Sequence, residues 1–185
     1  MHAAIASAVA ALRGGGVVAY PTEAVYGLGC DPHNAGAVAR LFAFKQRPAS
    51  QGVLLIAAEF AQVEKYIDRS RLPAAALARA RATWPGPHTW VFPRAPATPA
   101  WLAGAHAGIA LRVTAHAPAA ELCRAFGGAL VSTSANRHGE APARSAADVR
   151  AAFGEELAYI LRGSIGKLAQ PTPIRDAVSG ELLRG

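Results

Sequence analysis

Three short segments of the sequence carry hydroxyl, carboxylate and cationic side chains in patterns that could bind an anionic ligand. The first is residues 21–29 (PTEAVYGLG), which offers the hydroxyl of Thr22, the charge of Glu23 and the polar tip of Tyr26, with glycines that let a backbone approach a ligand closely. It follows a predicted buried strand, and ligands gather at strand ends in open α/β sheets. A loop that only connects two elements, with glycines for turning, is the alternative.

The second segment places two cations, Lys45 and Arg47, one residue apart at the predicted end of a helix and directly before Pro48. Both side chains could point the same way from an extended segment. That arrangement suits a polyphosphate, which lysine meets as a point charge and arginine as a two-pronged donor. Alternatively, basic residues in the last turn of a helix only stabilise its dipole.

The third segment, residues 132–136 (STSAN), clusters hydroxyls and an amide after a predicted buried strand. Side chains such as Ser134 and Asn136, together with backbone N–H groups, can hydrogen-bond a phosphate or a carboxylate. A turn whose polar side chains satisfy their own backbone is the alternative. Each segment alone is ambiguous, and the three together are far more specific than any one of them.

In this order, PTEAVYGLG, KQR and STSAN resemble the YrdC/TsaC family of threonylcarbamoyl-AMP synthases. The resemblance extends to residues 84–89 (WPGPHT), 111–113 (LRV) and 174–182 (IRDAVSGEL), and it covers the chain from about residue 5 to its end. We expect no second domain. The chain is therefore similar to the short members of the family, with a single YrdC-like domain over residues 1–185.

Members of this family make L-threonylcarbamoyl-adenylate from L-threonine, bicarbonate or CO2, and ATP, and they release pyrophosphate. The resemblance therefore implies a nucleotidyltransferase with ATP as a substrate and Mg²⁺ carried with ATP. Partner proteins of the TsaB, TsaD and TsaE type then transfer the threonylcarbamoyl group to the adenosine beside the anticodon of tRNAs that read ANN codons. The implied fold is a twisted, open, mixed α/β sheet with flanking helices and a concave basic groove.

The resemblance also assigns roles to individual residues. The residues that match the family's contacts to ATP phosphates are Lys45, Arg47, Ser134 and Asn136, and the first two are the expected catalytic residues. The residues that match its threonine contacts are Thr22, Arg112, Ser132 and Thr172. Arg112 would pair with the amino-acid carboxylate, and Thr22 would recognise the threonine hydroxyl. One departure is Ser50-Gln51-Gly52, where many members carry a basic residue or a histidine.

The elements that must position these segments alternate between strands and helices, which is typical of an α/β domain. We expect strands at 17–20, 53–56, 89–92, 109–113 and 129–132, the first stopped by Pro21, and a terminal hairpin with its tip at Ser179-Gly180. We expect helices at 3–12, 34–45, 59–66, 72–83, 118–126 and 145–153, with Gly14 ending the first, Asn34 capping the second, and Ser145 and Asp148 forming a capping box. The prolines and the short late strands favour a mixed sheet.

Composition bounds the class of protein. The 185 residues suit one domain, and 52% hydrophobic against 17% charged residues exclude an intrinsically disordered chain. A net charge of +7 favours an anionic partner such as a nucleotide or RNA, although a codon bias toward Ala and Arg would give the same excess. No apolar run approaches the roughly 18 residues of a membrane span, and two cysteines suit a reducing compartment. We therefore expect a cytoplasmic protein without membrane contact.

Two other functions stay open from the sequence. One is a non-catalytic domain that binds double-stranded RNA or tRNA in the same basic groove, and the other is a related enzyme with a different carboxylic substrate. No cluster of Cys and His has metal-ligand spacing, so we expect no protein-bound metal. Cys30 and Cys123 are instead predicted to be buried, and His33 to lie in a surface loop.

Overall fold

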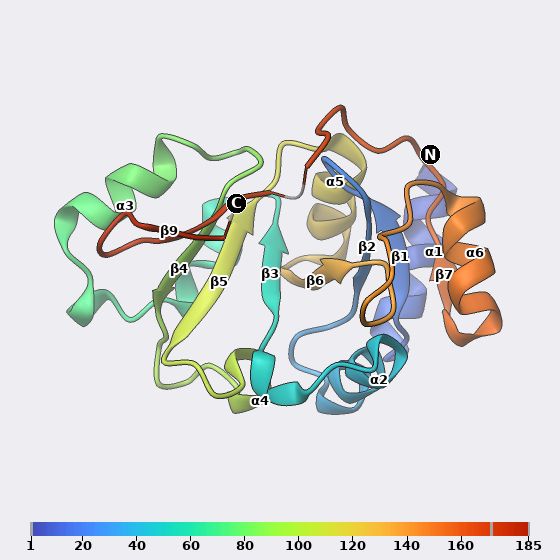
Figure 1. Cartoon of the computed structure of the whole chain (residues 1–185), viewed down its shortest axis with the longest axis horizontal. Coiled ribbons are helices and arrows are strands. Elements are labelled where there is room, and N and C mark those ends of the chain that lie inside the picture. The colour runs from blue at the N-terminus through green and yellow to red at the C-terminus, as the bar shows by residue number, and fades with distance from the viewer. Residues whose placement is uncertain (1, 171, 185) are drawn as a thin grey trace.

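The computed structural model describes residues 2–170 and 172–184, and within them one open sheet of nine strands forms the centre of the molecule (Figure 1). The strands are β1 (Val18–Pro21), β2 (Tyr26–Gly29), β3 (Leu54–Ala57), β4 (Thr89–Pro93), β5 (Gly108–Val113), β6 (Leu130–Ser134), β7 (Tyr159–Ile160), β8 (Ile174–Asp176) and β9 (Leu182–Arg184). Their order across the sheet is β7-β1-β2-β6-β3-β5-β4-β8-β9. The pairs β1–β7, β3–β5 and β4–β8 are parallel and the others are antiparallel, which confirms the predicted mixed sheet.

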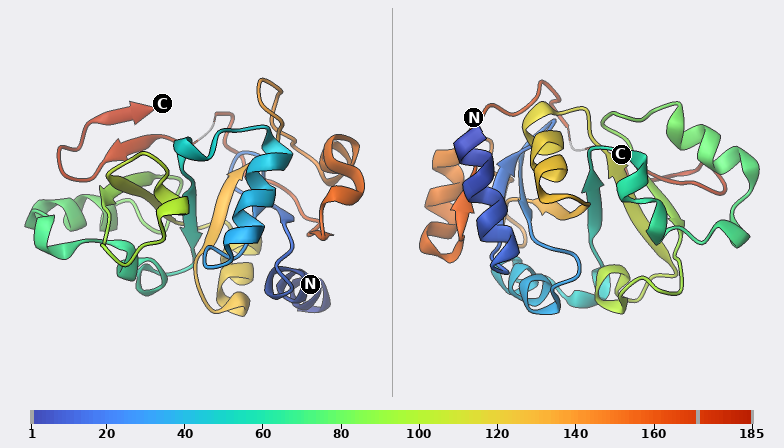
Figure 2. Two further views of the ribbon diagram at one scale, coloured as in Figure 1. Left: turned by 90° about the horizontal axis from the view of Figure 1, so that it is seen from below. Right: turned by 180° about the vertical axis from the view of Figure 1, so that it is seen from behind.

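Helices cover both faces of this sheet. They are α1 (His2–Arg13), α2 (Ala35–Lys45), α3 (Ala74–Arg81), α4 (Ala100–Ala103), α5 (Ala117–Phe126) and α6 (Ala146–Phe153). Helices α1 and α5 pack on one face, where Leu12 and Leu122 join Tyr20 and Ile56 in a buried cluster. Helix α2 packs on the opposite face, where Leu41 joins Leu55 and Val131 in a second cluster (Figure 2). The β8–β9 hairpin forms one edge of the sheet, beside β4. Of the helices in the described residues, none combines the length and the apolar character needed to cross a membrane.

Local sequence signals set several of the boundaries as predicted. The Asn34 side chain accepts a hydrogen bond from the backbone N–H of Ala37 (3.0 Å) and so begins α2. Ser145 and Asp148 form the reciprocal capping box of α6. Helix α2 ends at Lys45 because Gln46 adopts a left-handed conformation (φ 51°), two residues before Pro48 could stop it. This turn determines where the two cations of the second segment point.

The first segment differs from the predicted loop, because it is a β-hairpin in which β2 pairs antiparallel with β1. Two of the four residues of β2 are glycines, which have a low strand propensity, and the sequence therefore predicted a loop here. Gly29 is there for packing, since a Cβ at this position would lie 2.5 Å from the carbonyl oxygen of Val131 and 2.7 Å from the ring of Tyr20. Gly29 therefore lets the sheet close against Tyr20, and it does not provide room for a ligand.

Other expectations also need correction. The helix predicted at 59–66 is two short 3-10 turns, Phe60–Gln62 and Glu64–Tyr66. Pro21 does not stop β1 but is its last residue, paired with Tyr26. The left-handed glycine after α1 is Gly15 (φ 78°) instead of Gly14. Helix α4 and strand β7 had no clear sequence signal, because each is very short. The predicted terminal hairpin is confirmed as β8 and β9.

Candidate functional site

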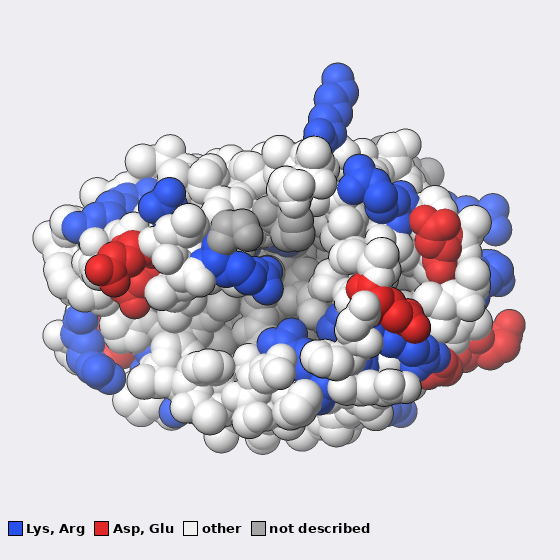
Figure 3. All heavy atoms as spheres, viewed as in Figure 1, with Lys and Arg blue, Asp and Glu red and all other residues white. Residues whose placement is uncertain are grey.

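A cavity of ≈ 820 Å³ is lined by residues of the central strands, of the C-terminal end of α2 and of the C-terminal hairpin. Figure 3 shows the hollow in the middle of one face of the molecule, with Lys and Arg side chains at its rim. All eight site residues predicted from the sequence line it: Thr22, Lys45, Arg47, Arg112, Ser132, Ser134, Asn136 and Thr172. Segments that are more than a hundred residues apart therefore converge on one site.

Lys45 joins the second segment to the third. Its side chain is buried, and Nζ donates to the backbone oxygens of Ser134 (2.6 Å) and Asn136 (2.9 Å) and lies 3.3 Å from Oδ1 of Asn136. These partners lie outside α2, so Lys45 does more than stabilise the dipole of its own helix. Burial first, and the neighbouring charge of Arg47 second, lower the pKa of Lys45 to about 8.

Arg47 follows the left-handed turn at Gln46 and also lines the cavity. Its Nη2 donates to the backbone oxygens of Gln51 (3.1 Å) and Gly52 (2.9 Å). Its Nε is buried and has no hydrogen-bond partner among the described residues. Burial and the charge of Arg184 lower the pKa of Arg47. Arg47 is thus held in place by backbone carbonyls and still has an N–H to offer an anion.

The third segment is partly strand and partly turn. Ser132 belongs to β6 as predicted, and the strand continues through Thr133 and Ser134, which were expected to follow it. Ser134 Oγ donates to Oδ1 of Asn136 (2.6 Å), and the Asn136 amide donates to the backbone oxygens of Arg137 (2.9 Å) and Glu140 (3.0 Å). The Asn136 amide therefore satisfies the backbone of its own turn, as the alternative interpretation predicted. Ser134 and Asn136 nevertheless both line the cavity.

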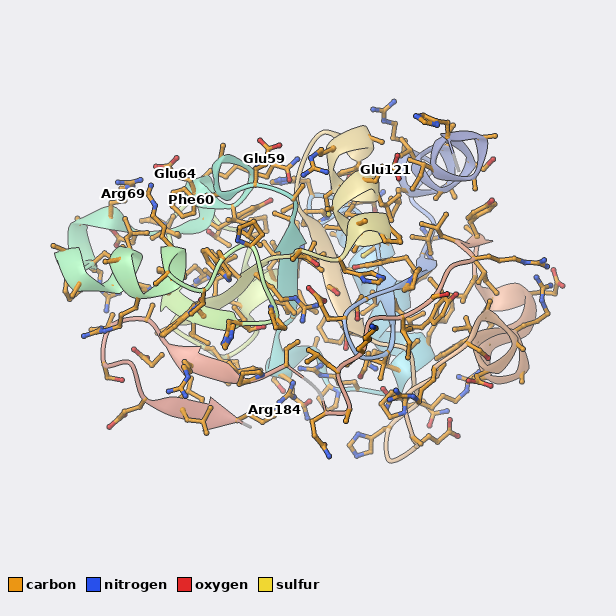
Figure 4. All side chains as sticks on the ribbon, turned by 90° about the horizontal axis from the view of Figure 1, so that it is seen from above. Glu59, Phe60, Glu64, Arg69, Glu121 and Arg184 are labelled. Carbon is orange, nitrogen blue, oxygen red and sulfur yellow. The ribbon has the colours of Figure 1, made fainter. Side chains whose placement is uncertain are left out.

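Arg184, at the end of β9, is a lining residue that sequence reasoning missed. The hairpin brings it to the rim of the cavity, where its charge acts on Arg47 (Figure 4). An arginine after two leucines in a short terminal strand has no motif, so only the register of the hairpin reveals it. We call the part of the groove that Lys45, Arg47, Arg184, Ser134 and Asn136 line the nucleotide end, after the ligand expected from the sequence.

The other end of the groove is lined by Thr22, Arg112, Ser132 and Thr172, and we call it the amino-acid end after the ligand expected from the sequence. Thr22 Oγ1 donates to the backbone oxygen of Val25 (2.7 Å), so its hydroxyl is left to accept a hydrogen bond from a ligand. Ser132 is buried within β6 and presents a second hydroxyl. This end therefore offers neutral acceptors beside one cation.

Arg112 is the cation of the amino-acid end. It lies on β5, between β3 and β4, and it is only 5% exposed, so it is not the exposed edge residue that the sequence left as an alternative. Its Nη1 donates to Thr172 Oγ1 (2.8 Å), and its Nη2 lies 3.8 Å from Oε2 of Glu23. Its Nε is buried without a hydrogen-bond partner among the described residues. This N–H is available to a ligand carboxylate.

The residues considered as metal ligands have other surroundings. Cys30 and Cys123 are buried free thiols, as expected. His33 is exposed, and its Nε2 lies 2.9 Å from the hydroxyl of Tyr66. Within residues 2–170 and 172–184, no three His, Cys, Asp or Glu side chains come together in a way that could hold a metal ion.

The fold and the groove define a class of α/β domain in which a cavity with cationic side chains lies between the central strands and the β8–β9 hairpin at the edge of the sheet. The comparison with family models makes this specific, because residues 10–185 match the Sua5_yciO_yrdC model, described as "Telomere recombination". The chain belongs to the Sua5/YciO/YrdC family.

Named relatives span nearly the whole chain. The chain is 56% identical over 177 residues to a threonylcarbamoyl-AMP synthase of Halorhodospira halophila, covering 96% of this chain and 92% of that protein. It is 54% identical over 183 residues to one of Alkalilimnicola ehrlichii, covering 97% and 94%. Among solved structures, it resembles P. abyssi Sua5 in complex with L-threonine, with a TM-score of 0.87, 32% identity, and coverage of 93% of this chain and 50% of that one.

Proposed function

We propose that this protein is a threonylcarbamoyl-AMP synthase, a nucleotidyltransferase that forms threonylcarbamoyl-AMP and pyrophosphate from L-threonine, bicarbonate or CO2, and ATP. The observation that carries the proposal is that one cavity joins the nucleotide end to the amino-acid end. The names of the relatives and the threonine complex of P. abyssi Sua5 support it. A volume of ≈ 820 Å³ suits small molecules, whereas an RNA duplex needs a long open surface.

At the nucleotide end, the phosphates of ATP would meet Lys45, Arg47 and Arg184. The Lys45 ammonium already holds the backbone oxygens of Ser134 and Asn136, so its charge lies directly beneath the loop that would receive the phosphates. Arg47 Nε is the free donor. Because these groups are fixed before ATP arrives, they stabilise the developing charge on pyrophosphate with little reorganisation.

At the amino-acid end, Arg112 would bind the carboxylate of threonine and Thr22 would accept a hydrogen bond from the threonine hydroxyl. The amine then points toward the nucleotide end. We propose that the ammonium of bound threonine first loses one proton to water. The neutral amine then adds to CO2 and loses a second proton to water, which gives N-carboxy-threonine. The new carboxylate oxygen attacks the α-phosphorus of ATP, and the bond from that phosphorus to the bridging oxygen of pyrophosphate breaks. Threonine's own carboxylate, held by Arg112, does not attack.

Mg²⁺ would enter with ATP, bound chiefly by phosphate oxygens and water, as is usual for this ion. The groove presents hydroxyl and amide oxygens such as those of Ser134 and Asn136, which suit a hydrated ion better than a tightly bound one. The product would pass to partner proteins of the TsaB, TsaD and TsaE type for transfer to tRNA.

The experiment that tests this function is pyrophosphate release in CO2-depleted buffer. Release should require ATP, threonine and added bicarbonate together. Full-rate release with threonine and ATP but no CO2 source would mean that an ordinary aminoacyl-adenylate forms, which would refute the mechanism. Binding of tRNA or double-stranded RNA without any threonine-dependent turnover would instead support the non-catalytic alternative.

A further inference from the structure

Behind the amino-acid end lies a buried ion pair. Four ion pairs join described residues, and only the pair of Glu23 and Arg112 has both side chains buried, with 9% and 6% of their surfaces exposed. Oε1 of Glu23 accepts a hydrogen bond from Thr114 Oγ1 (2.5 Å), and Oε2 lies 3.8 Å from Nη2 of Arg112 without a hydrogen-bond partner among the described residues. Glu23 itself does not line the cavity.

The position of Glu23 is fixed from the backbone as well. The N–H of Leu168 donates to the backbone oxygen of Glu23 (3.2 Å), and the N–H of Gly166 donates to that of Thr22 (2.9 Å). A Cβ at Gly166 would lie 2.4 Å from the Glu23 oxygen, so this segment packs directly on the first motif. The carboxylate is therefore held behind Arg112 by contacts that do not depend on a ligand.

The Glu23 carboxylate reduces the positive charge that the amino-acid end presents to a ligand. Arg112 alone would attract any carboxylate or phosphate, but a carboxylate 3.8 Å away cancels much of its charge. A zwitterion has no net charge, and its ammonium is attracted by Glu23 while its carboxylate is attracted by Arg112. An anion without an ammonium gains only the second attraction and is repelled by Glu23.

We infer that Glu23 is a specificity-determining residue: its buried charge makes the amino-acid end select a zwitterionic amino acid over a simple hydroxy-acid anion. This inference rests on the proposed function, because it takes threonine as the ligand of this end. Glu23 acts through Arg112 and through the field in the site, without touching the substrate. Its side-chain charge, and not only its shape, is what matters.

The test compares L-threonine with (R)-3-hydroxybutyrate, which lacks only the amino group. Calorimetry gives the affinity of each ligand for the wild-type protein and for Glu23→Gln, which can keep the hydrogen bond to Thr114 but loses the charge. The preference for threonine should fall by about five- to tenfold in the variant, while ATP affinity stays unchanged. A preference equal to that of the wild type would overturn the inference.

Two further variants separate charge from shape. Glu23→Asp keeps the charge and should keep most of the preference, even if both ligands bind less tightly; a preference as low as that of Glu23→Gln would contradict the inference. Glu59→Gln is the matched control, because Glu59 also pairs with an arginine, Arg124 (3.4 Å), but is exposed and lies on the opposite side of the molecule from Arg184 (Figure 4). It should change neither affinity.

The outcome also distinguishes this inference from the proposed function. If threonine does not bind the wild-type protein, the proposed function fails. If threonine binds and Glu23→Gln leaves its preference intact, only the inference about Glu23 fails. If Glu23→Gln does not fold, the wild-type comparison still decides, since equal affinities for threonine and (R)-3-hydroxybutyrate would contradict a site that selects zwitterions.

Discussion

The two ends of the groove both carry arginines, but they treat that charge in opposite ways. At the nucleotide end, Arg47 and Arg184 act on each other as like charges, and burial and this repulsion lower the pKa of Arg47. At the amino-acid end, Arg112 faces the buried carboxylate of Glu23. One end therefore accumulates positive charge, and the other balances it.

This difference would match each end to the net charge of its proposed ligand. Cations that repel one another in the free protein gain most from a polyphosphate, because it removes the repulsion and adds attraction. A balanced pair gains little from a polyanion, whereas the carboxylate of a zwitterion is attracted by Arg112 and its ammonium is attracted at longer range by the charge of Glu23. Separate electrostatics would let ATP and threonine bind side by side without exchanging places.

The largest expected effect concerns a neutral group at the amino-acid end. Replacing threonine by valine should lower the specificity constant for pyrophosphate release by up to about 10⁴-fold, because the buried Thr22 oxygen would lose its hydrogen-bond donor. Rates with each amino acid at saturating ATP check this. In Thr22→Val the ratio of the specificity constants for threonine and valine should be smaller. A wild-type protein that uses valine as well as threonine would show that Thr22 does not recognise the threonine hydroxyl.

The next effect concerns the cations of the nucleotide end. Lys45→Ala and Arg47→Ala should each weaken ATP binding and lower ATP-dependent activity by tenfold to a hundredfold or more, since a charge-assisted contact contributes on the order of 1.5–3 kcal/mol. Threonine affinity should change little. Titration of both variants with ATP is the measurement, with thermal unfolding as the control for folding. Unchanged ATP affinity in both would remove these residues from the nucleotide end.

The sequence predicted the site better than it predicted the elements that form it. Residue types and spacing indicated Thr22, Lys45, Arg47 and the 132–136 segment, because phosphate and carboxylate chemistry restricts which side chains can serve, and the family resemblance added Arg112 and Thr172. Strand β2 was mistaken for a loop because it contains two glycines, of which Gly29 is required by the close approach of Tyr20 on the neighbouring strand. Propensity does not contain that information, since tertiary packing supplies it.

The ion-pair and hydrogen-bond partners of the site residues also could not be predicted from the sequence. Glu23 stood out as a charged residue in the first motif, but nothing local indicated that it would face Arg112 and Thr114 of β5 and its flank. In the same way, three acceptors from the third segment surround the Lys45 ammonium, and no helix pattern reveals this. A residue's role that depends on a long-range contact can be predicted only when the order of the strands in the sheet is known.

A smaller effect should follow from loosening the loop between the cations. Asn136→Ala removes the acceptor shared by Lys45 and Ser134, so it should weaken nucleotide binding by about tenfold. Threonine binding should be nearly unaffected. Calorimetry with both ligands checks the difference, and an equal loss of both would mean that the loop supports the whole groove and not one end.

The smallest effect is a pH dependence that belongs to the nucleotide end. Because burial lowers the pKa of Lys45 to about 8, the ammonium is lost as the pH rises through this value, and phosphates prefer its charged form. ATP affinity should therefore fall by about fivefold between pH 7.5 and pH 9. Lys45→Arg, which stays charged in this range, should have a flatter profile. A profile that rises with pH would contradict the assignment.

The central claim is that the groove has two ends with separate ligands, and crossed calorimetry tests it most directly. ATP and L-threonine are each titrated into Arg47→Ala and into Arg112→Ala, with the wild-type protein as reference. The account predicts that Arg47→Ala loses ATP affinity and keeps threonine affinity, whereas Arg112→Ala loses threonine affinity and keeps most of its ATP affinity. If both variants lose the same ligand to the same extent, the division of the groove is wrong.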